Sequence, residues 1–231
     1  MSGNSMPVNY QQRYDAENPN TPLLTLEALA SSDDPGVRIA VARNKSTPIE
    51  ALLLLSKDRI AKVKSGAIET LCTKAEMATL SHDHQMLLSR GVPSRIIESL
   101  AKNDNLAQDV FAHLAKASKN VRYNIARNKA TPAGILLSII VSDKDINVYA
   151  AAWSTASEFE PSYWERSYSL KEWSLDMPID GNITLGDALL DKRLQALYQT
   201  LLSSELSAQI CASTEATSQD LASPRTRLLR M

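Results

Sequence analysis

The sequence predicts an all-α fold, a solenoid of short stacked helix pairs that ends in a non-repeat helical cap. Residues 37–48 read VRIAVARNKSTP and residues 121–132 read VRYNIARNKATP, so eight of twelve positions are identical. An internal match of this density indicates a repeat architecture. The chain has only 7 Gly among 231 residues and no alternating apolar pattern, so nothing in it predicts a β-sheet.

Each copy of the motif ends in Thr-Pro, which predicts the start of a helix. The Thr47 hydroxyl is suited to capping, and Pro48 suits the first helical position, where no backbone donor is needed. Glu50 completes a T-x-x-E capping box, and Asp34-Pro35 repeats the combination of a capping residue and proline. Alignment on such prolines gives four copies, which start at Pro22, Pro48, Pro93 and Pro132.

Every copy carries two sets of apolar residues at helical spacing. Large aliphatics follow the prolines in pairs: Leu26/Leu29, Leu52/Leu55, Ile97/Leu100 and Leu136/Ile139. The next helix carries an i, i+3, i+4 triad: Val37/Ala40/Val41, Val63/Gly66/Ala67, Val110/His113/Leu114 and Val148/Ala151/Ala152. Helix pairs this short cannot bury an apolar stripe alone, so the copies must stack on one another.

The pattern V-R-x-x-[VI]-A-R-N-x-x-T-P, followed by an aliphatic helix, resembles the leucine-rich repeat variant family of HEAT-like bacterial α-solenoids. The resemblance covers residues 20–155, with a degenerate gap between residues 71 and 92. It implies a helix paired with a shorter helix in each repeat, and generally no catalysis. The copies start at irregular intervals, whereas family repeats keep a regular step, so further repeats are expected near residues 74–90 and 118–128.

Composition divides the chain into four segments. Residues 1–19 are polar and are predicted to be flexible. Residues 20–156 form the predicted solenoid, and residues 157–211 form an aromatic-rich helical C-terminal region. Residues 212–231 are rich in Ser and Thr and form a predicted flexible tail.

The middle of the chain is basic, although the net charge is −1. Residues 36–130 carry 16 Lys and Arg against 8 Asp and Glu, an excess that could mark an anion-binding surface. The better reading is that these residues lie on the solvated faces of solenoid helices, because nucleic-acid binders usually show a stronger excess. The candidate anion or nucleic-acid contacts are Arg38, Arg43, Lys45, Arg122, Arg127 and Lys129. The recurring Arg-Asn pairs are better read as structural, because each repeat must solve the same capping problem: the asparagine ends a helix and the arginine bonds carbonyl groups between repeats.

The aromatic residues gather just after the repeats, and two readings of them stay open. They could cover the apolar end of the solenoid, as a terminal repeat must, in which case most rings of Trp153, Phe159, Trp164 and Trp173 are buried. They could instead form a partner patch with Trp164, Tyr168 and Trp173 as contact residues, because Trp and Tyr are enriched in interface hot spots.

No catalytic, metal-binding or cofactor-binding constellation is evident in the sequence. His82-Asp83-His84 follows Cys72, but zinc needs about four ligands and no second cluster supplies the rest, so a polar turn is the better reading. There is no Gly-rich phosphate loop and no G-x-S-x-G motif. We therefore expect no enzymatic activity, no cofactor and no small-molecule substrate.

The sequence thus predicts a non-enzymatic protein-interaction module with an unidentified protein partner. The alternative is a nucleic-acid-binding protein that uses residues 36–130. HEAT-like DNA glycosylases resemble the chain in architecture alone, and its tryptophans lie outside the basic middle. A bacterial effector or accessory protein is a third class. Two distant cysteines, no long apolar run and no signal-peptide pattern predict a soluble, cytoplasmic protein without a membrane segment.

Overall fold

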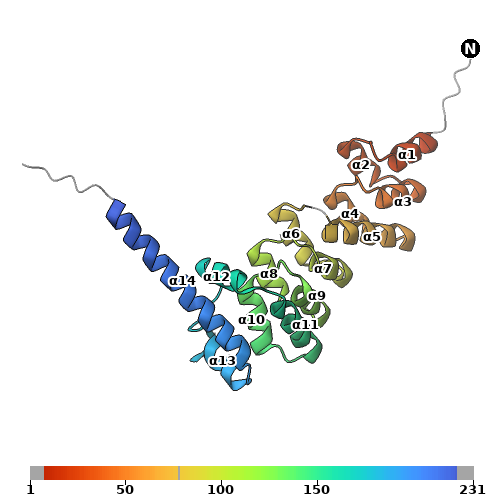
Figure 1. Ribbon diagram of the computed structural model, residues 1–231. Helices are drawn as coiled ribbons and strands as arrows, with labels where there is room; N and C mark the ends of the chain where they lie inside the picture. The colour runs from red at the N-terminus through yellow and green to blue at the C-terminus, as the bar shows by residue number, and fades with distance from the viewer. Residues whose placement is uncertain (1–7, 78, 223–231) are drawn as a thin grey trace, which may run out of the picture. The chain divides into compact units, whose positions relative to one another are not determined.

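The computed structural model describes residues 8–77 and 79–222. These residues form fourteen helices and one two-stranded hairpin (Figure 1). Successive helices pack on one another like stacked repeats, which confirms the predicted fold class. The chain forms two compact units, which divide between Ala130 and Thr131.

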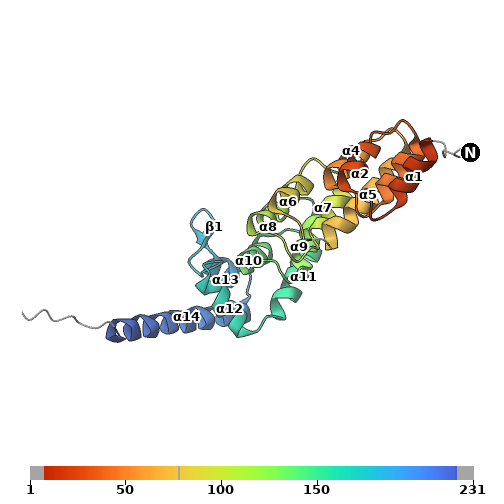
Figure 2. The same ribbon diagram turned by 90° about the horizontal axis from the view of Figure 1, so that it is seen from above.

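The N-terminal unit consists of short helices that alternate between two layers. The helices are α1 (Val8–Glu17), α2 (Leu23–Leu29), α3 (Pro35–Arg43), α4 (Ile49–Leu55), α5 (Ala61–Met77), α6 (His82–Ser89), α7 (Ser94–Leu100), α8 (Gln108–Leu114) and α9 (Lys119–Arg127). In one layer α1, α3, α5, α7 and α9 each pack on the next, and α2, α4, α6 and α8 lie along one side of it (Figures 1 and 2). The buried core includes Leu26, Val37, Leu52, Leu55, Val63, Leu71, Leu88, Leu100 and Leu114.

The third repeat predicted from Pro93 is out of phase with the others. Helix α7, which follows Pro93, packs on α5 and α9 and so belongs to the layer of α3, whereas α2 and α4 lie in the other layer. Ile96 is consequently fully buried and Ile97 only partly. Helices α6 and α9 occupy the places where further repeats were expected. The irregular spacing arises in α5, which has 17 residues where α3 and α9 have 9.

Asparagine side chains join neighbouring helices of this layer. Each amide donates to carbonyl oxygens at or just beyond the end of the preceding layer helix: Asn44 to Ala16 and Asn18, Asn103 to Ala75, and Asn128 to Ala101 and Asn103, at 2.8–3.2 Å. Asn44 and Asn128 are the C-caps of α3 and α9, which confirms that asparagine ends these helices. The last carbonyls of a helix have no partner within it, so each asparagine supplies the donor that they need.

The predicted capping box at Thr47 is wrong. Pro48 is the N-cap of α4, and no side chain caps this end. The Thr47 hydroxyl donates instead to a carbonyl oxygen of α3 at 2.7 Å, and the Glu50 carboxylate bonds a histidine of α6. The cap predicted before α3 is confirmed, because the Asp34 carboxylate accepts from the backbone N–H of Gly36 at 2.7 Å.

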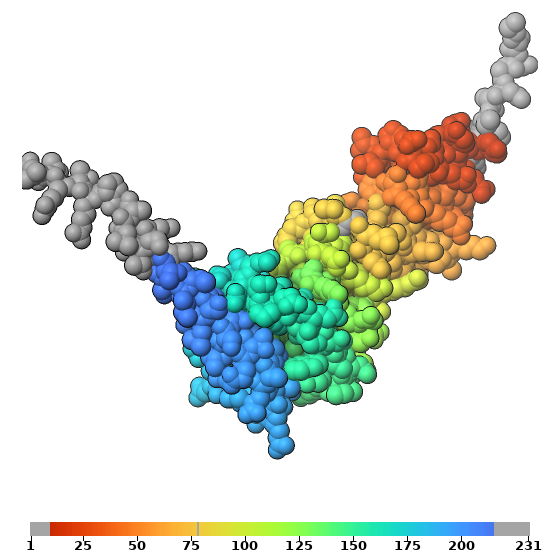
Figure 3. Space-filling model, in the orientation of Figure 1, coloured from red at the N-terminus to blue at the C-terminus, as the bar shows by residue number. Residues whose placement is uncertain are grey.

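The C-terminal unit contains two repeat-like helices and an irregular helical region. Its elements are α10 (Ala133–Ser142), α11 (Ile146–Ser157), α12 (Pro161–Ser169), β1 (Pro178–Asp180), β2 (Ile183–Thr184), α13 (Leu185–Asp191) and α14 (Gln195–Ala222). The two short strands pair antiparallel. Helix α10 packs on α11 and α13, and α14 packs on α12 and α13. Figure 1 shows the C-terminal part of α14 (blue) running past the other elements of this unit, and Figure 3 shows the earlier part of the helix (blue) packed against them.

The segments predicted from composition differ from the structure at both ends. Residues 8–17, which fall in the segment expected to be flexible, form α1, and Ala16 is fully buried. The reason is that α1 packs on α3 and that Asn44 bonds the carbonyls at its end. Helix α14 continues to Ala222, beyond the predicted start of the tail. Residues 1–7 and 223–231 of the two predicted flexible ends lie outside the described residues.

Candidate interaction site

The aromatic segment after α11 folds back so that its rings meet inside the C-terminal unit. Pro161 occupies the first turn of α12, where its fixed φ suits a helix start. Phe159 stacks on Tyr163 with ring centroids 3.9 Å apart and meets Trp164 edge-on at 5.7 Å. Trp164 in turn meets Trp173 edge-on at 6.2 Å. Edge-to-face pairs of this kind stabilise a cluster beyond the area that they bury.

Burial divides these rings into two classes. Trp164 is 1% exposed and Trp173 is 2% exposed, whereas Trp153 and Phe159 are half-buried. The expectation that most of the four rings are buried in the monomer is therefore confirmed for Trp164 and Trp173 only. Burial also raises the pKa of the Tyr163 hydroxyl to about 12.

Trp173 is fixed by a hydrogen bond and by the turn that precedes it. Its indole N–H donates to Ser167 Oγ at 2.8 Å, and this hydroxyl donates to the Trp164 carbonyl oxygen at 3.0 Å. Lys171 follows α12 with a left-handed φ of 60°, and the Glu172 N–H donates back to the Ser167 carbonyl oxygen at 3.0 Å. This pattern ends the helix and returns the chain toward α10.

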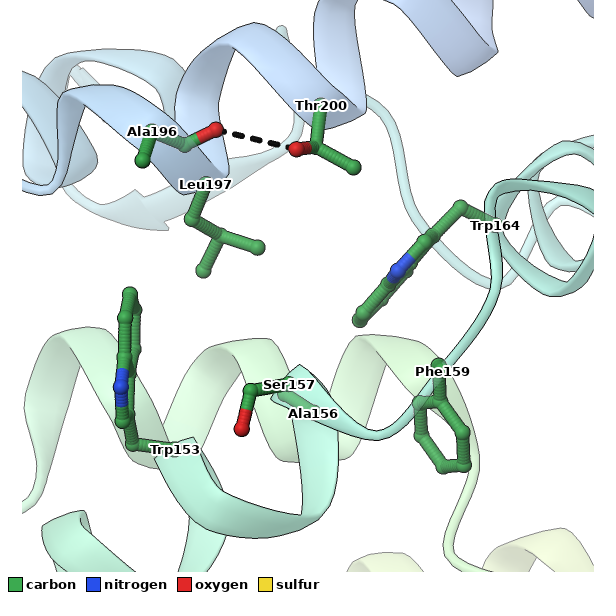
Figure 4. Close-up of a pocket in the computed structure, with 8 residues that line it drawn as sticks. All are labelled: Trp153, Ala156, Ser157, Phe159, Trp164, Ala196, Leu197 and Thr200. Carbon is green, nitrogen blue, oxygen red and sulfur yellow. Dashed lines mark hydrogen bonds between the residues drawn. The ribbon is translucent and has the colours of Figure 1, made fainter.

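A cavity of about 230 Å³ opens between α11, α12 and the start of α14 (Figure 4). It is called the aromatic pocket below, and its lining residues are Trp153, Ala156, Ser157, Phe159, Trp164, Ala196, Leu197 and Thr200. Figure 4 shows the ring of Trp153 on one side and the rings of Trp164 and Phe159 on the other, with Leu197 reaching in from α14. None of the eight lining side chains is charged. Such a pocket suits apolar contact more than acid–base chemistry.

A second, larger hollow lies between the end of α12, residues 171–178 and α14. The Tyr168 hydroxyl accepts a hydrogen bond from the Gln209 side-chain amide at 3.0 Å across this region. Tyr168 and Trp173 line the larger hollow, whereas Trp164 lines the aromatic pocket. The three residues predicted as a partner patch are thus divided between two hollows, one near each end of α12.

Two of the six predicted anion contacts bond groups of their own unit. Arg38 is 8% exposed, and its Nε lies 2.7 Å from Asp58 Oδ2 while its Nη1 donates to the Ser32 carbonyl oxygen. The Asp58 hydrogen bond raises the pKa of Arg38, and the guanidinium lowers the pKa of Asp58. Arg122 donates likewise to the Ala117 carbonyl oxygen at 3.0 Å. Arg38 and Arg122, the first arginine of each copy of the motif, therefore bond backbone carbonyl groups of the turn before their own helix.

The remaining predicted contacts are exposed, and they are Arg43, Lys45, Arg127 and Lys129. The structural role expected for the arginine before asparagine is wrong, because the asparagine amide already satisfies the helix-end carbonyls. Arg127 instead lies over the ring of Tyr123, 5.7 Å from its centroid. Arg43 lies across Gly66 of α5, where a Cβ would stand 3.4 Å from its Cγ.

The surface around Arg127 and Lys129 carries mixed charge. A hollow beside α7 and α9 is lined by Lys102, Arg127 and Lys129, together with Asp104. The adjoining hollow along α5 and α7 adds Arg95 and three carboxylates, which belong to Glu69, Glu76 and Glu98. Lys102 lies 3.4 Å from the Glu76 carboxylate. A phosphate backbone laid here would meet carboxylates beside every group of cations, which weakens the electrostatic case for nucleic acid.

The histidines of the predicted polar turn begin α6, where each meets the carboxylate of a different helix. His84 Nε2 lies 2.9 Å from Glu50 Oε1 of α4, and His82 Nε2 lies 2.9 Å from Asp109 Oδ2 of α8. The Glu50 backbone N–H and then His84 lower the pKa of the Glu50 carboxyl, and His82 lowers that of Asp109. Within residues 8–77 and 79–222, no three His, Cys, Asp or Glu side chains gather as metal ligands.

Helices α3 and α4, with the Asn44 cap and the Thr47 turn between them, form one unit that can be compared with known repeats. Residues 35–59 match the leucine rich repeat variant family. The matched leucine-rich repeat variant segment also contains both partners of the Arg38–Asp58 ion pair. The match confirms the resemblance, and the second copy of the motif at residues 121–132 lies outside it.

No curated protein and no solved structure matches the chain. In the part of the chain that the structure describes, no helix combines the length and the apolar character needed to cross a bilayer.

Proposed function

We propose that this chain is a non-enzymatic protein-interaction module, in which helical repeats act as the scaffold and the C-terminal unit provides a contact site. The observation that carries the proposal is the aromatic pocket, where the half-buried rings of Trp153 and Phe159 flank the buried ring of Trp164. Interface hot spots are enriched in tryptophan and lie in pockets that exclude water.

The placement of charged groups in the two units supports a role in protein–protein contact more than a role in catalysis. The histidines best suited to acid–base work, His82 and His84, belong to the N-terminal unit and each meets a carboxylate of a neighbouring helix. The aromatic pocket has no charged lining residue. The free cysteines Cys72 and Cys211 are in keeping with a reducing cytoplasm, which we propose as the location.

Quantitative affinity capture from cells of the source organism tests the proposal. The intact chain would be immobilised beside a Trp153→Ala variant and a matched control, Tyr14→Ala, which removes an exposed ring from α1. We expect a captured protein whose yield falls about tenfold with Trp153→Ala, equivalent to about 1.4 kcal/mol, and stays unchanged with Tyr14→Ala. Circular dichroism would first establish that all three chains are folded. Equal capture by both variants would remove the aromatic pocket from the proposal.

A further inference from the structure

We infer that the N-terminal unit carries a second contact site, a charged groove across α5, α7 and α9. Its ligand is an extended peptide segment with one cationic and one acidic side chain about three residues apart. The groove consists of the two adjoining hollows described above, whose volumes are about 500 and 380 Å³. It shares no residue with the aromatic pocket, so it goes beyond the proposed function.

The two hollows form one continuous groove. Lys102 and Asn124 line both of them, and α7 packs on α5 at one side and on α9 at the other. All the lining residues belong to the N-terminal unit. The groove therefore crosses three successive helices of one layer.

The charges of the groove are separated by sign. Carboxylates predominate in the hollow along α5 and α7, where Glu69, Glu76 and Glu98 accompany Arg95 and the shared Lys102. Cations predominate in the hollow beside α7 and α9, where Lys102, Arg127 and Lys129 accompany Asp104. The two hollows therefore favour ligand groups of opposite charge.

This separation disfavours ligands of a single charge sign. A phosphate backbone or a uniformly acidic peptide that lies in the groove meets the carboxylates of the first hollow. A uniformly basic peptide meets the cations of the second. Because like-charge contacts reject wrong partners, the groove suits a segment that carries both signs.

Two of the cations are held by neighbouring side chains and still reach solvent. Lys102 Nζ lies 3.4 Å from Glu76 Oε2, and the two side chains stay 48% and 38% exposed. Arg127 lies over the ring of Tyr123, 5.7 Å from its centroid, and is exposed. Side chains held in this way lose less freedom when a ligand binds.

Asn124, which lines both hollows, favours a peptide backbone as the link between the two charges. Its Nδ2 donates to the Glu98 carbonyl oxygen at 2.9 Å, which orients the side-chain amide. An asparagine amide has two N–H groups and one oxygen, so beyond this bond Asn124 offers one donor and one acceptor. A peptide unit, with its N–H and its C=O, complements this pair.

The spacing of the two charges on the peptide follows from helix packing. One hollow lies between α5 and α7 and the other between α7 and α9, so they are displaced by one helix step. Packed helices lie about 8–10 Å apart. An extended peptide advances about 3.3–3.6 Å per residue. A cation and a carboxylate about three residues apart therefore reach both hollows.

Peptide titrations of the full chain, followed by ¹H–¹⁵N NMR, test the inference. The probes are acetyl-Arg-Ser-Gly-Glu-amide and the reversed acetyl-Glu-Ser-Gly-Arg-amide, and the controls carry two arginines or two glutamates in the same frame. We expect one mixed peptide to bind at least about fivefold more tightly than both controls, and added salt to weaken this binding. A control that binds as tightly, or no binding of either mixed peptide, would overturn the inference.

A charge-reversed groove provides the matched comparison. In the double variant Arg127→Glu/Lys129→Glu, carboxylates predominate in both hollows, so we expect the peptide with two arginines to become the tightest ligand. Lys62→Glu/Lys64→Glu makes the same change of net charge at exposed positions of α5 outside the groove and should keep the preference for the mixed peptide. Circular dichroism would first establish that both variants are folded. An unchanged preference in the groove variant, or the same inversion in the control, would contradict the inference.

A reversal in the other hollow tests the inference independently of α9. Glu69→Lys leaves cations predominant in both hollows, and Glu69 is exposed, so the substitution should leave the fold intact. We expect this variant to bind the peptide with two glutamates most tightly. A continued preference for the mixed peptide would reject the assignment of the acidic hollow to the cationic side chain.

Discussion

Gly134 of α10 lies against the backbone carbonyl oxygen of Glu172, so closely that a Cβ at this position would overlap the oxygen. The Glu172 carboxylate accepts a hydrogen bond from the Ala133 N–H at 2.9 Å. One residue of the turn after α12 thus contacts the start of α10 through both its backbone and its side chain. This contact holds in place the segment that carries Trp173.

Gly134→Ala should therefore destabilise the C-terminal unit. The added methyl group meets backbone, which cannot move aside as a flexible side chain can, so we expect a loss of about 1–3 kcal/mol or more. Gly66→Ala is the control: it is also a helical glycine, but its Cβ would meet side-chain atoms at 3.4–3.5 Å, which is ordinary contact. That variant should be neutral or gain up to about 1 kcal/mol from helix propensity. Urea unfolding followed by circular dichroism, which reports the helices of both units, measures both variants, and equal effects would contradict the prediction.

Asn44→Ala should destabilise the N-terminal unit. The substitution leaves the Ala16 and Asn18 carbonyl oxygens without the amide that bonds them at 2.8 and 2.9 Å. Unsatisfied buried groups cost about 1–3 kcal/mol each, so the free energy of unfolding should fall by at least about 1 kcal/mol. Asn20→Ala, which truncates an exposed asparagine, should change it by less than about 0.5 kcal/mol. Amide hydrogen exchange should also show faster opening of α1. Unchanged exchange in α1 would show that the Asn44 hydrogen bonds do not stabilise this helix.

The repeat could be predicted from the sequence because its structural residues recur locally. Asn44 and Asn128 end α3 and α9, and Thr-Pro follows each at the same distance, so the motif marks both turns. The phase of α7 was not predictable from proline, since Pro93 precedes a helix of the opposite layer. Helix α1 was missed because it buries little, and its carbonyls are bonded by an asparagine 28 residues away.

Only part of the lining of the aromatic pocket could be predicted from the sequence. The tryptophans stood out by composition, but their division into buried and half-buried rings depends on contacts with a later helix. Leu197 and Thr200, which complete the lining, come from α14, and no local pattern links them to Trp153. The role of Arg38 was also missed, because Asp58 lies 20 residues away and only the fold brings the two together.

Nucleic acid should bind weakly. Carboxylates lie among the exposed cations near α9, so we expect duplex DNA and RNA to bind no tighter than about 10⁻⁴ M at near-physiological salt. Fluorescence anisotropy with labelled oligonucleotides measures this. Charge reversal at Glu69 and Glu98 should strengthen binding and steepen its salt dependence. Micromolar binding by the unaltered chain that is lost in Arg43→Ala and Arg127→Ala would instead favour the nucleic-acid reading.

Lys171→Gly should stabilise the C-terminal unit. Lys171 has a φ of 60°, a left-handed conformation that costs most residues energy and costs glycine little. We expect a gain of about 0.5–1 kcal/mol, and the same for Arg193→Gly, whose φ is 59°. Gly181→Ala is the reverse control, because its φ is 54° and no atom lies near the added Cβ. Thermal unfolding should give a higher melting temperature for Lys171→Gly and Arg193→Gly than for the unaltered chain, and a lower one for Gly181→Ala. A stabilising effect of Gly181→Ala would contradict the prediction.

Acidification should weaken the contacts that α6 makes with α4 and α8. The pKa of the Glu50 carboxyl is lowered in the folded chain, first by its own backbone N–H and then by His84, and His82 lowers the pKa of Asp109. The folded state therefore holds these protons more weakly than the unfolded chain does. The resulting stability is complete above the unfolded pKa values of about 4, and it is lost as the pH falls through the lower folded values.

Glu50→Gln should reveal this pH dependence. Because the Glu50 side chain is 60% exposed, its loss should lower the free energy of unfolding near neutral pH by only about 0.2–1 kcal/mol. The difference from the unaltered chain should shrink as the pH falls below about 4, since both chains are then uncharged at this position. Asp109→Asn should show a pH dependence of the same direction. Glu27→Gln, at an exposed position on α2, is the control and should change the free energy of unfolding little near neutral pH. Urea unfolding from neutral pH down to about pH 3 covers the range in which the carboxyl groups titrate. A Glu50→Gln deficit that stays constant across this range would show that the residue acts through packing and that its charge contributes nothing.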